Sequence, residues 1–178
     1  MCKENAVYLI TGVMAAGKST VAQLLSERLD KSVHVRGDVF RKMIVNGEMQ
    51  MSDTPSAEAL EQLRLRYRLA ANVSDMYAEA GFHTVVQVII GPMLEEMVKL
   101  ISYRPLYVIV LAPRADIIAA RESARKKKGY GDISIESLDA VLQSETPRLG
   151  LWLDSSEMTP EETVGMIYKG LETAAKIK

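Results

Sequence analysis

The residues best suited to chemistry lie near the amino terminus, where positions 10–20 read Ile-Thr-Gly-Val-Met-Ala-Ala-Gly-Lys-Ser-Thr. Gly12 and Gly17 permit backbone angles that a side chain would oppose, so successive amide N–H groups can turn inward around an anion. Lys18 adds a full positive charge, and a helix beginning there adds the partial positive charge of its amino end. Together these features predict a loop that binds phosphate.

The spacing of this stretch matches the Walker A pattern, which is glycine, four residues, glycine, lysine and then serine or threonine. We therefore predict nucleotide contacts from Gly12, Val13, Met14, Ala15, Ala16, Gly17, Lys18, Ser19 and Thr20. The hydroxyl of Ser19 can also ligate the Mg²⁺ that accompanies ATP. The alternative is a chance match in a tight turn, and the position of the stretch between an apolar run and a helical pattern argues against it.

A dinucleotide-binding loop is a second alternative for the same region. Asp38 lies 20 residues beyond Lys18, and dinucleotide folds carry an acid at about that distance. Those folds space their glycines as Gly-x-Gly-x-x-Gly, a pattern that Val13 and Met14 do not fit. We therefore expect ATP rather than a nicotinamide cofactor.

A second informative stretch runs His-Val-Arg-Gly-Asp-Val-Phe-Arg from His34 to Arg41. It follows a strand, and the carboxyl ends of parallel strands are where such sheets bind ligands. Asp38 can accept a proton from a substrate hydroxyl, and Arg41 can bind a substrate oxygen or phosphate. The alternative is that Asp38 caps the helix expected from Val39. We interpret His34 as a structural residue of the strand.

Positions 121–129 concentrate basic residues in the segment Arg-Glu-Ser-Ala-Arg-Lys-Lys-Lys-Gly. Arg121 and Arg125 are one helical turn apart and can point the same way, so we predict that both help transfer the phosphoryl group by stabilising its charge. For Lys126–Lys128 a solvated helix end explains the charges equally well. RNA binding is a minor option, because no aromatic residues are interleaved and the chain has no strongly basic balance.

Short apolar runs alternate with longer stretches at helical spacing, which predicts an α/β sandwich with a parallel sheet. The expected strands are 7–10, 32–35, 84–90, 106–111 and 151–153. The expected helices are 18–29, 39–46, 57–79, 92–102, 114–127, 135–143 and 160–175. Ser56 and Gly81 punctuate the third of these helices, and Pro160 followed by two glutamates begins the last.

Four segments together resemble the small P-loop kinases, especially the chloramphenicol phosphotransferase-like group. They are the phosphate loop, Gly-Asp-x-x-Arg at 37–41, Arg-Glu-Ser-Ala-Arg at 121–125 and Leu-Trp-Leu-Asp-Ser-Ser at 151–156. Shikimate, gluconate and adenylate kinases are looser relatives. The resemblance covers nearly the whole chain and implies one domain over 1–178, a three-layer sandwich, and a five-stranded parallel sheet of order 2-3-1-4-5.

The resemblance also implies roles for individual residues. The acid at the position of Asp38 deprotonates the acceptor hydroxyl in that group, and a helical lid over about 121–132 brings Arg121 to the nucleotide and Arg125 to the transferred phosphate. Asp154 would lie beside the adenine, although it can equally be a turn former. Trp152 can equally be a core residue. Whether Arg148 contacts a ligand stays open.

The third expected strand departs from the pattern of many P-loop enzymes, which place an aspartate at its end to steer Mg²⁺. Here the strand reads His-Thr-Val-Val-Gln-Val-Ile-Ile, and Gln87 is the polar residue in its interior. An amide cannot supply the missing charge. Asp38 can cover part of the metal role, which would compete with its role as the base.

Composition limits the remaining possibilities. The chain has 178 residues, is 48% hydrophobic and 25% charged, and has a formal net charge of −1. That balance does not draw it to nucleic acid or anionic lipid, and no apolar run reaches the length that spans a bilayer. The apolar run before the glycine loop fits a buried strand better than a secretory signal. A single cysteine, Cys2, fits a cytoplasmic protein.

These observations predict an ATP-dependent, Mg²⁺-requiring kinase that phosphorylates a hydroxyl of a small molecule, such as an antibiotic or a sugar-like metabolite. We expect a monomer or homodimer with no membrane partner. A nucleoside or nucleotide kinase is the nearest alternative. A nucleotide-binding regulatory protein without an acceptor is the alternative from a different functional class.

Overall fold

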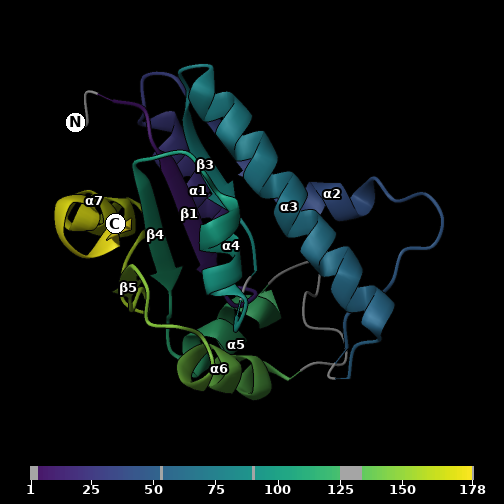
Figure 1. Cartoon of the computed structure of the whole chain (residues 1–178). Helices are drawn as coiled ribbons and strands as arrows, with labels where there is room; N and C mark the ends of the chain where they lie inside the picture. Colours follow the sequence, from purple (N-terminus) through teal and green to yellow (C-terminus); the bar gives the residue numbers. More distant parts are fainter. Residues whose placement is uncertain (1–3, 53, 90, 125–133, 178) are drawn as a thin grey trace.

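A parallel sheet forms the centre of the chain (Figure 1). The computed structural model describes residues 4–52, 54–89, 91–124 and 134–177. The parallel strands are β1 (Val7–Gly12), β2 (Ser32–Arg36), β3 (His83–Gln87), β4 (Leu106–Leu111) and β5 (Leu151–Leu153). Their order is β2-β3-β1-β4-β5, and every neighbouring pair is parallel. The predicted order 2-3-1-4-5 is therefore confirmed.

A short antiparallel strand that was not predicted, β6 (Lys176–Ile177), adds to the five predicted parallel strands. It pairs antiparallel with Leu106 and Tyr107 of β4, whereas β5 pairs with the later half of β4, from Ile109 to Leu111. Both strands thus pair with the same edge of β4, β6 near its beginning and β5 near its end. Two residues carry no alternating pattern, so β6 could not be predicted from the sequence.

Helices cover both faces of the sheet and its carboxyl edge. They are α1 (Lys18–Glu27), α2 (Asp38–Lys42), α3 (Ala57–Glu79), α4 (Leu94–Leu100), α5 (Ala115–Ala124), α6 (Ile135–Ser144) and α7 (Pro160–Gly170), which continues into the π-helical turn η1 (Leu171–Ala175). Figure 1 shows α3 and α4 on the near side of the sheet and α1 behind it, and α1 packs against α7. Helices α5 and α6 lie beyond the end of the β4 arrow. No helix among the described residues combines the length and apolar character needed to cross a bilayer.

The core is centred on β1 and β4, in which all six residues of each strand are buried. Strands of a parallel sheet are covered on both faces, so they are apolar on both faces. The rings of Tyr8 and Tyr107 stack across this pair with centroids 5.3 Å apart. The central strands are thus rigid supports for the loops that follow their carboxyl ends.

The third strand is shorter than the predicted range 84–90. Its last partners are Ile10 on one side and Arg36 on the other, both paired with Gln87. Beyond Arg36 the chain turns at Gly37, whose N–H donates to the carbonyl of Gln87 at 2.8 Å. Strand β2 ends at Arg36, and β1 continues to Gly12 beside β4 alone, so the apolar residues after Gln87 leave the sheet.

The second helix is also shorter than the predicted range 39–46, since it ends at Lys42. Val45 is 89% exposed, so continuing the helix would bury nothing there. Short helices depend on such packing for their stability. Gly47, with φ of +80°, then turns the chain toward α3.

The remaining boundaries differ by smaller amounts. The helix predicted over 92–102 ends at Leu100 because Ile101 is extended, and the carboxylate of Asp75 accepts the next two amides, from Ser102 and Tyr103. The helix predicted over 18–29 ends at Glu27. The helix predicted over 160–175 changes to the wider π-helical turn after Gly170. The helix predicted over 114–127 is described up to Ala124, and its remainder lies outside the described residues.

Candidate active site

The phosphate loop joins the last residue of β1 to the first residue of α1. Three of its residues have positive φ, namely Gly12 (+143°), Ala15 (+61°) and Gly17 (+94°). A Cβ on Gly12 would collide with the carbonyl oxygen of Leu111 on β4, so glycine is required there on steric grounds as well as for its φ. The backbone conformation that the two glycines predicted is therefore present in the structure.

Lys18 begins α1 and is 6% exposed. Its ammonium donates to the carbonyl oxygen of Val13 at 2.6 Å, so the side chain spans the loop and its charge lies within the ring of backbone. Ser19 and Thr20 follow on the exposed side of the first turn. The helix begins without a side-chain cap and without an acidic residue in its first turn, so its positive amino end is uncompensated by its own side chains.

Gln87, at the end of β3, connects this loop to the second informative stretch. The end of its side-chain amide lies 2.8 Å from the hydroxyl of Ser19. The same residue accepts the backbone N–H of Gly37 at 2.8 Å, and a Cβ on Gly37 would approach the Val88 side chain too closely. The turn that carries Asp38 is thus packed directly against the strand end that contacts Ser19.

Asp38 is the first residue of α2, whose N-cap is Gly37 and has no side-chain cap bond. The structure therefore does not place Asp38 in the capping role. Its carboxylate pairs with Lys42 at 2.9 Å, and both side chains are more than half exposed. Burial alone would raise the pKa of Asp38, but the hydrogen bond and charge of Lys42 outweigh it and hold the pKa below its ordinary value. Asp38 is consequently ionised near neutral pH and able to accept a proton.

Arg41, one turn further along α2, faces the segment that links α2 to α3. Its guanidinium pairs with Glu48 at 3.3 Å and donates to Gln50 at 3.2 Å. A neighbouring cation, Arg66 on α3, was not selected from the sequence. The Nε of Arg66 is buried and has no hydrogen-bond partner among the described residues. Burial lowers the pKa of Arg66, and Arg41, Glu48 and Asp38 are charges that act on it.

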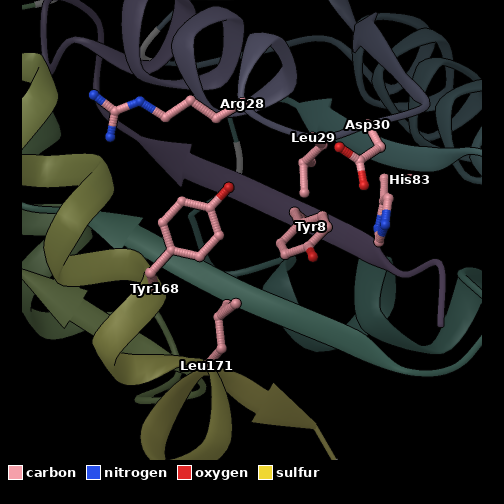
Figure 2. A pocket seen from close by; sticks show the side chains of 7 residues that line it. All are labelled: Tyr8, Arg28, Leu29, Asp30, His83, Tyr168 and Leu171. Atoms are coloured by element: carbon pink, nitrogen blue, oxygen red, sulfur yellow. The ribbon is translucent and has the colours of Figure 1, made fainter. Parts of the chain in front are cut away.

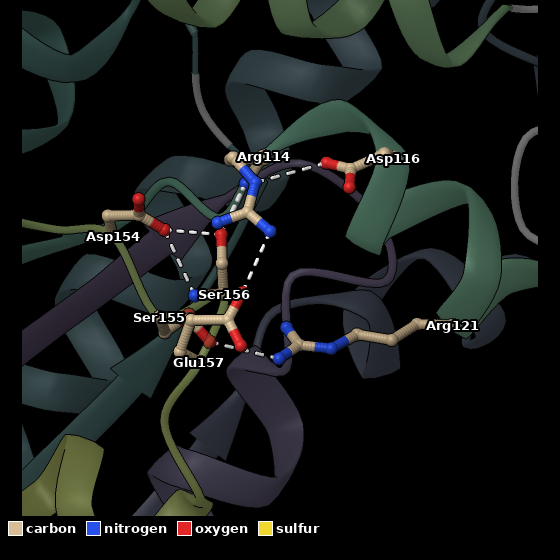
Figure 3. Close-up of polar contacts among 7 residues, drawn as sticks. All are labelled: Arg114, Asp116, Arg121, Asp154, Ser155, Ser156 and Glu157. Atoms are coloured by element: carbon tan, nitrogen blue, oxygen red, sulfur yellow. Dashed lines mark hydrogen bonds and ion pairs between the residues drawn. The ribbon is translucent and has the colours of Figure 1, made fainter.

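Arg121 extends from α5 toward the loop that follows β5 (Figure 3). Its guanidinium donates to the carbonyl of Ser155 at 3.0 Å, and a Cβ on Gly17 would lie 4.0 Å from one of its nitrogens. Arg121 therefore lies beside the phosphate loop. Its predicted companion Arg125 lies outside the described residues, as does the rest of the predicted lid up to 132.

Asp154 follows β5 and is exposed, with its carboxylate in a local turn (Figure 3). One oxygen accepts both the backbone N–H and the hydroxyl of Ser156. These bonds lower the pKa of Asp154. The Ser156 hydroxyl also accepts the N–H of Arg114 at the start of α5. The structure thus gives Asp154 the turn-forming role that the sequence left open, and nucleotide contact by this residue stays a prediction.

Trp152 in β5 and Arg148, which precedes that strand, contact each other. The Arg148 guanidinium lies over the indole ring, 3.8 Å from its centroid. The indole is half-buried rather than fully in the core, and its N–H has no partner within the described part of the chain.

A family model described as an AAA domain matches residues 9–140, about three quarters of the chain. The chain belongs to the AAA domain family. The match begins inside β1, spans the phosphate loop and Asp38, and ends inside α6. No curated protein matches this AAA-domain chain significantly.

Solved structures of kinases share the fold of this AAA-domain protein. A sugar kinase from Janibacter sp. HTCC2649 has 19% identity and a TM-score of 0.69, over 96% of both chains. The shikimate kinase of Bacteroides thetaiotaomicron has 15% identity and a TM-score of 0.64, over 94% of this chain and 98% of the other. The APS kinase of Mycobacterium tuberculosis has 15% identity and a TM-score of 0.60, over 96% and 99%.

Two hollows of the AAA-domain chain differ in what they can accept. An open hollow of about 410 Å³ borders the first turns of α1 and is lined by Ser19, Thr20, Gln23, Leu24, Glu27, Arg36, Pro160 and Glu161. A cavity of about 30 Å³ lies at the amino end of β1 and is lined by residues that include Tyr8, His83 and Tyr168 (Figure 2). The smaller one has room for about one or two water molecules, so it is not a substrate site.

The structure brings most of the predicted site residues to one edge of the sheet. The loop with Lys18 and Ser19 follows β1, the turn with Asp38 follows β2, and Arg121 contacts the loop that follows β5. Sequence reasoning missed the contact between Gln87 and Ser19 and the burial of Arg66. Arg64 and Arg68 are one helical turn apart and lie on the same face of α3, whereas Arg66 is two positions from each and lies on a different face. That difference in face was the sequence feature that could have singled out Arg66.

Proposed function

We propose that this protein is a kinase that transfers the γ-phosphate of ATP to a hydroxyl group of a small molecule. The observation that carries the proposal is the loop from Gly12 to Ser19, in which backbone turned by three positive φ angles surrounds the buried ammonium of Lys18. Such a loop suits a polyphosphate, because its amides and its lysine all favour negative charge. The kinase folds reported above support the same activity.

The residues present also fit a magnesium ion that arrives with the nucleotide. No group of three or more histidine, cysteine, aspartate or glutamate side chains among the described residues could hold a metal. Magnesium bound by a kinase takes most of its ligands from phosphates and water. Ser19 would hold it, and the ion supplies neutralisation of phosphate charge when bound.

Asp38 is the proposed general base in this mechanism. Its carboxylate is ionised and exposed, and Asp38 directly follows Gly37, whose N–H donates to Gln87 at the end of β3. It would accept the proton of the acceptor hydroxyl as the oxygen approaches phosphorus. Lys18 and Arg121 would stabilise the charge on the transferred group, and Arg125 is proposed to assist them.

Arg66 favours an acceptor that itself carries a negative group. A nucleoside monophosphate, the acceptor of a nucleotide kinase, is one such compound. The buried Nε of Arg66 has no hydrogen-bond partner in the described part of the chain. The charges of Asp38 and Arg41 both act on the Arg66 guanidinium. A half-buried guanidinium such as that of Arg66 gains from a carboxylate or phosphate that hydrogen-bonds to it. Sugar acids, phosphorylated sugars and nucleoside monophosphates are therefore the first acceptors to test.

A screen of hydroxyl compounds with Mg-ATP, read by ADP release, tests the proposal. Neutral sugars, sugar acids, sugar phosphates, nucleosides, nucleoside monophosphates and hydroxylated antibiotics form the panel. We expect at least one compound to stimulate ADP release, and Asp38→Asn to reduce that turnover by roughly 10² or more while ATP affinity stays nearly the same. Arg114→Gln, which removes a surface ion pair with Glu157, is the control and should keep full turnover.

The outcomes separate the candidate functions. Binding of ATP without stimulation by any acceptor would favour the regulatory, non-catalytic alternative. Stimulation that survives Asp38→Asn unchanged would exclude Asp38 as the base. Selective stimulation by nucleoside monophosphates would favour the nucleotide kinase.

A further inference from the structure

The side chains of His34 and Gln87 contact each other, and Gln87 in turn contacts the hydroxyl of Ser19. The Nε2 of His34 lies 3.1 Å from the side-chain oxygen of Gln87, whose amide nitrogen lies 2.8 Å from the Ser19 hydroxyl. On its other side, the Nδ1 of His34 lies 3.0 Å from the side-chain oxygen of Gln23. Both ring nitrogens therefore face amide oxygens, which can only accept hydrogen bonds.

A neutral imidazole cannot satisfy both contacts, because it has one N–H and one lone pair. Burial is the largest influence on the pKa of His34 and lowers it; the charge of Arg36 acts in the same direction, and the opposing effects of the Gln87 contact and the Asp38 charge do not reverse the shift. The neutral ring is therefore the form to account for near neutral pH. One of the two glutamines must then turn its amide, a change that keeps every distance because the two ends of an amide have the same shape.

Gln23 is the glutamine that cannot turn. Its amide nitrogen donates to the carboxylate of Glu27 at 2.9 Å, and its oxygen accepts from the guanidinium of Arg36 at 3.3 Å. A carboxylate only accepts and a guanidinium only donates, so these partners fix the direction of the Gln23 amide. The Nδ1 of His34 is consequently the protonated nitrogen, and its Nε2 presents a lone pair to Gln87.

We propose that Gln87 is a positioning residue whose side-chain oxygen accepts a hydrogen bond from the Ser19 hydroxyl and leaves both serine lone pairs available to a nucleotide-bound magnesium ion. In this arrangement the Gln87 amide donates to His34 and its oxygen faces Ser19. The opposite arrangement would place an N–H on one of the two serine lone pairs and leave a single lone pair for a metal. Gln87 thus occupies the strand end where many P-loop enzymes have an aspartate, and it orients the serine without adding a negative charge.

The proposal rests on the proposed function, since it assumes a nucleotide that carries magnesium. It also explains why a neutral side chain can serve at this position. The backbone of Gln87 is fixed by Gly37 and by the pairs with Ile10 and Arg36, so its side chain starts from a rigid point. A side chain that orients a metal ligand typically contributes about 10- to 100-fold to metal affinity or activity.

Nitrogen-15 NMR of the histidine rings tests the proton arrangement without any nucleotide. The chain has two histidines, and the variant His83→Gln assigns the signals. We expect His34 at neutral pH as the neutral ring with the proton on Nδ1. A proton on Nε2, or a doubly protonated ring at pH 7.5, would overturn the proposal.

Calorimetry then tests the consequence for the metal, by comparing ATP with magnesium against ATP with a chelator. We expect Gln87→Leu to weaken Mg-ATP binding about tenfold or more and to leave ATP binding in chelator unchanged. Gln87→Glu, which keeps an acceptor facing Ser19, should retain the gain from magnesium. Thr84→Val is the matched control on the same strand, because the buried Thr84 hydroxyl has no partner among the described residues.

The two proposals fail in distinguishable ways. A folded wild-type protein that binds ATP in neither condition would remove the proposed function and this inference with it. Wild-type binding that gains from magnesium, together with a Gln87→Leu variant that gains equally, would overturn the inference alone. Circular dichroism of each variant confirms that a loss of affinity does not come from unfolding.

Discussion

Asp38 and Lys42 lie one turn apart on α2 and form an ion pair at the position proposed for the base. The pair has two opposing effects on catalysis. Lys42 keeps the carboxylate ionised over a wide pH range, because it lowers the pKa of Asp38. A lower pKa also makes the carboxylate a weaker base. The pair therefore trades base strength for a correct charge state at mildly acidic pH.

Lys42→Met tests this trade through the pH dependence of kcat/KM for an acceptor found in the screen. Activity requires ionised Asp38, so it falls as the pH drops through the pKa of that group. Removing the lysine charge raises this pKa, and the acidic limb should move to higher pH by roughly 0.2–0.7 pH unit, as expected for an exposed pair. Lys31→Met, remote in the fold, should leave the limb in place. A limb that does not move with Lys42→Met would mean that another group titrates.

The same pair also determines the direction in which the free energy of unfolding changes with pH. A carboxyl with a lowered pKa stabilises the fold above its ordinary pKa, and that contribution disappears as the pH falls through the lowered value. Both side chains of the pair are more than half exposed, so the contribution is small. Acid sensitivity of the whole fold must therefore come mainly from other groups.

At the scale of elements, the boundaries that could be predicted from sequence are those marked by residues that cap or end a helix. Helix α3 has the predicted range 57–79 because Ser56 caps it and Gly81, with φ of +84°, ends it. The apolar residues after Gln87 predicted a longer strand, but they leave the sheet where β2 ends at Arg36, while β1 continues to Gly12 beside β4 alone. Such an end depends on neighbouring strands, which local sequence does not report.

The start of α7 is fixed by a capping box, which provides a test of element stability. Thr159 accepts the N–H of Glu162 at 3.2 Å, and the Glu162 carboxylate accepts the N–H of Thr159 at 2.9 Å. Thr159→Ala should cost about 1 kcal/mol of unfolding free energy, which for a chain of this size lowers Tm by roughly 2–4 °C. Thr159→Ser keeps the acceptor and should stay close to wild type. Equal Tm values for Thr159→Ala and wild type in thermal denaturation would show that the box contributes nothing.

At the scale of the whole molecule, the sheet order gathers distant segments at one edge. Gln87 and Ser19 are 68 positions apart in the sequence, and they meet because β3 lies beside β1. The place of the loop between β1 and α1 was predictable from sequence because its residues are contiguous and its pattern is specific. The connection through His34 and Gln87 was not, because it requires three elements to be placed relative to one another. Arg66 became visible for the same reason, once α3 was packed beside α2.

The central claim is that the loop between β1 and α1 binds the phosphates of ATP, and calorimetric titration of the folded full chain with Mg-ATP tests it most directly. We expect measurable binding by the wild type, a loss of about tenfold or more in Lys18→Ala because its buried ammonium is removed, and wild-type affinity in Lys99→Ala, an exposed lysine of α4. No heat with Mg-ATP or Mg-GTP from the wild type, or equal affinity in Lys18→Ala, would contradict the claim.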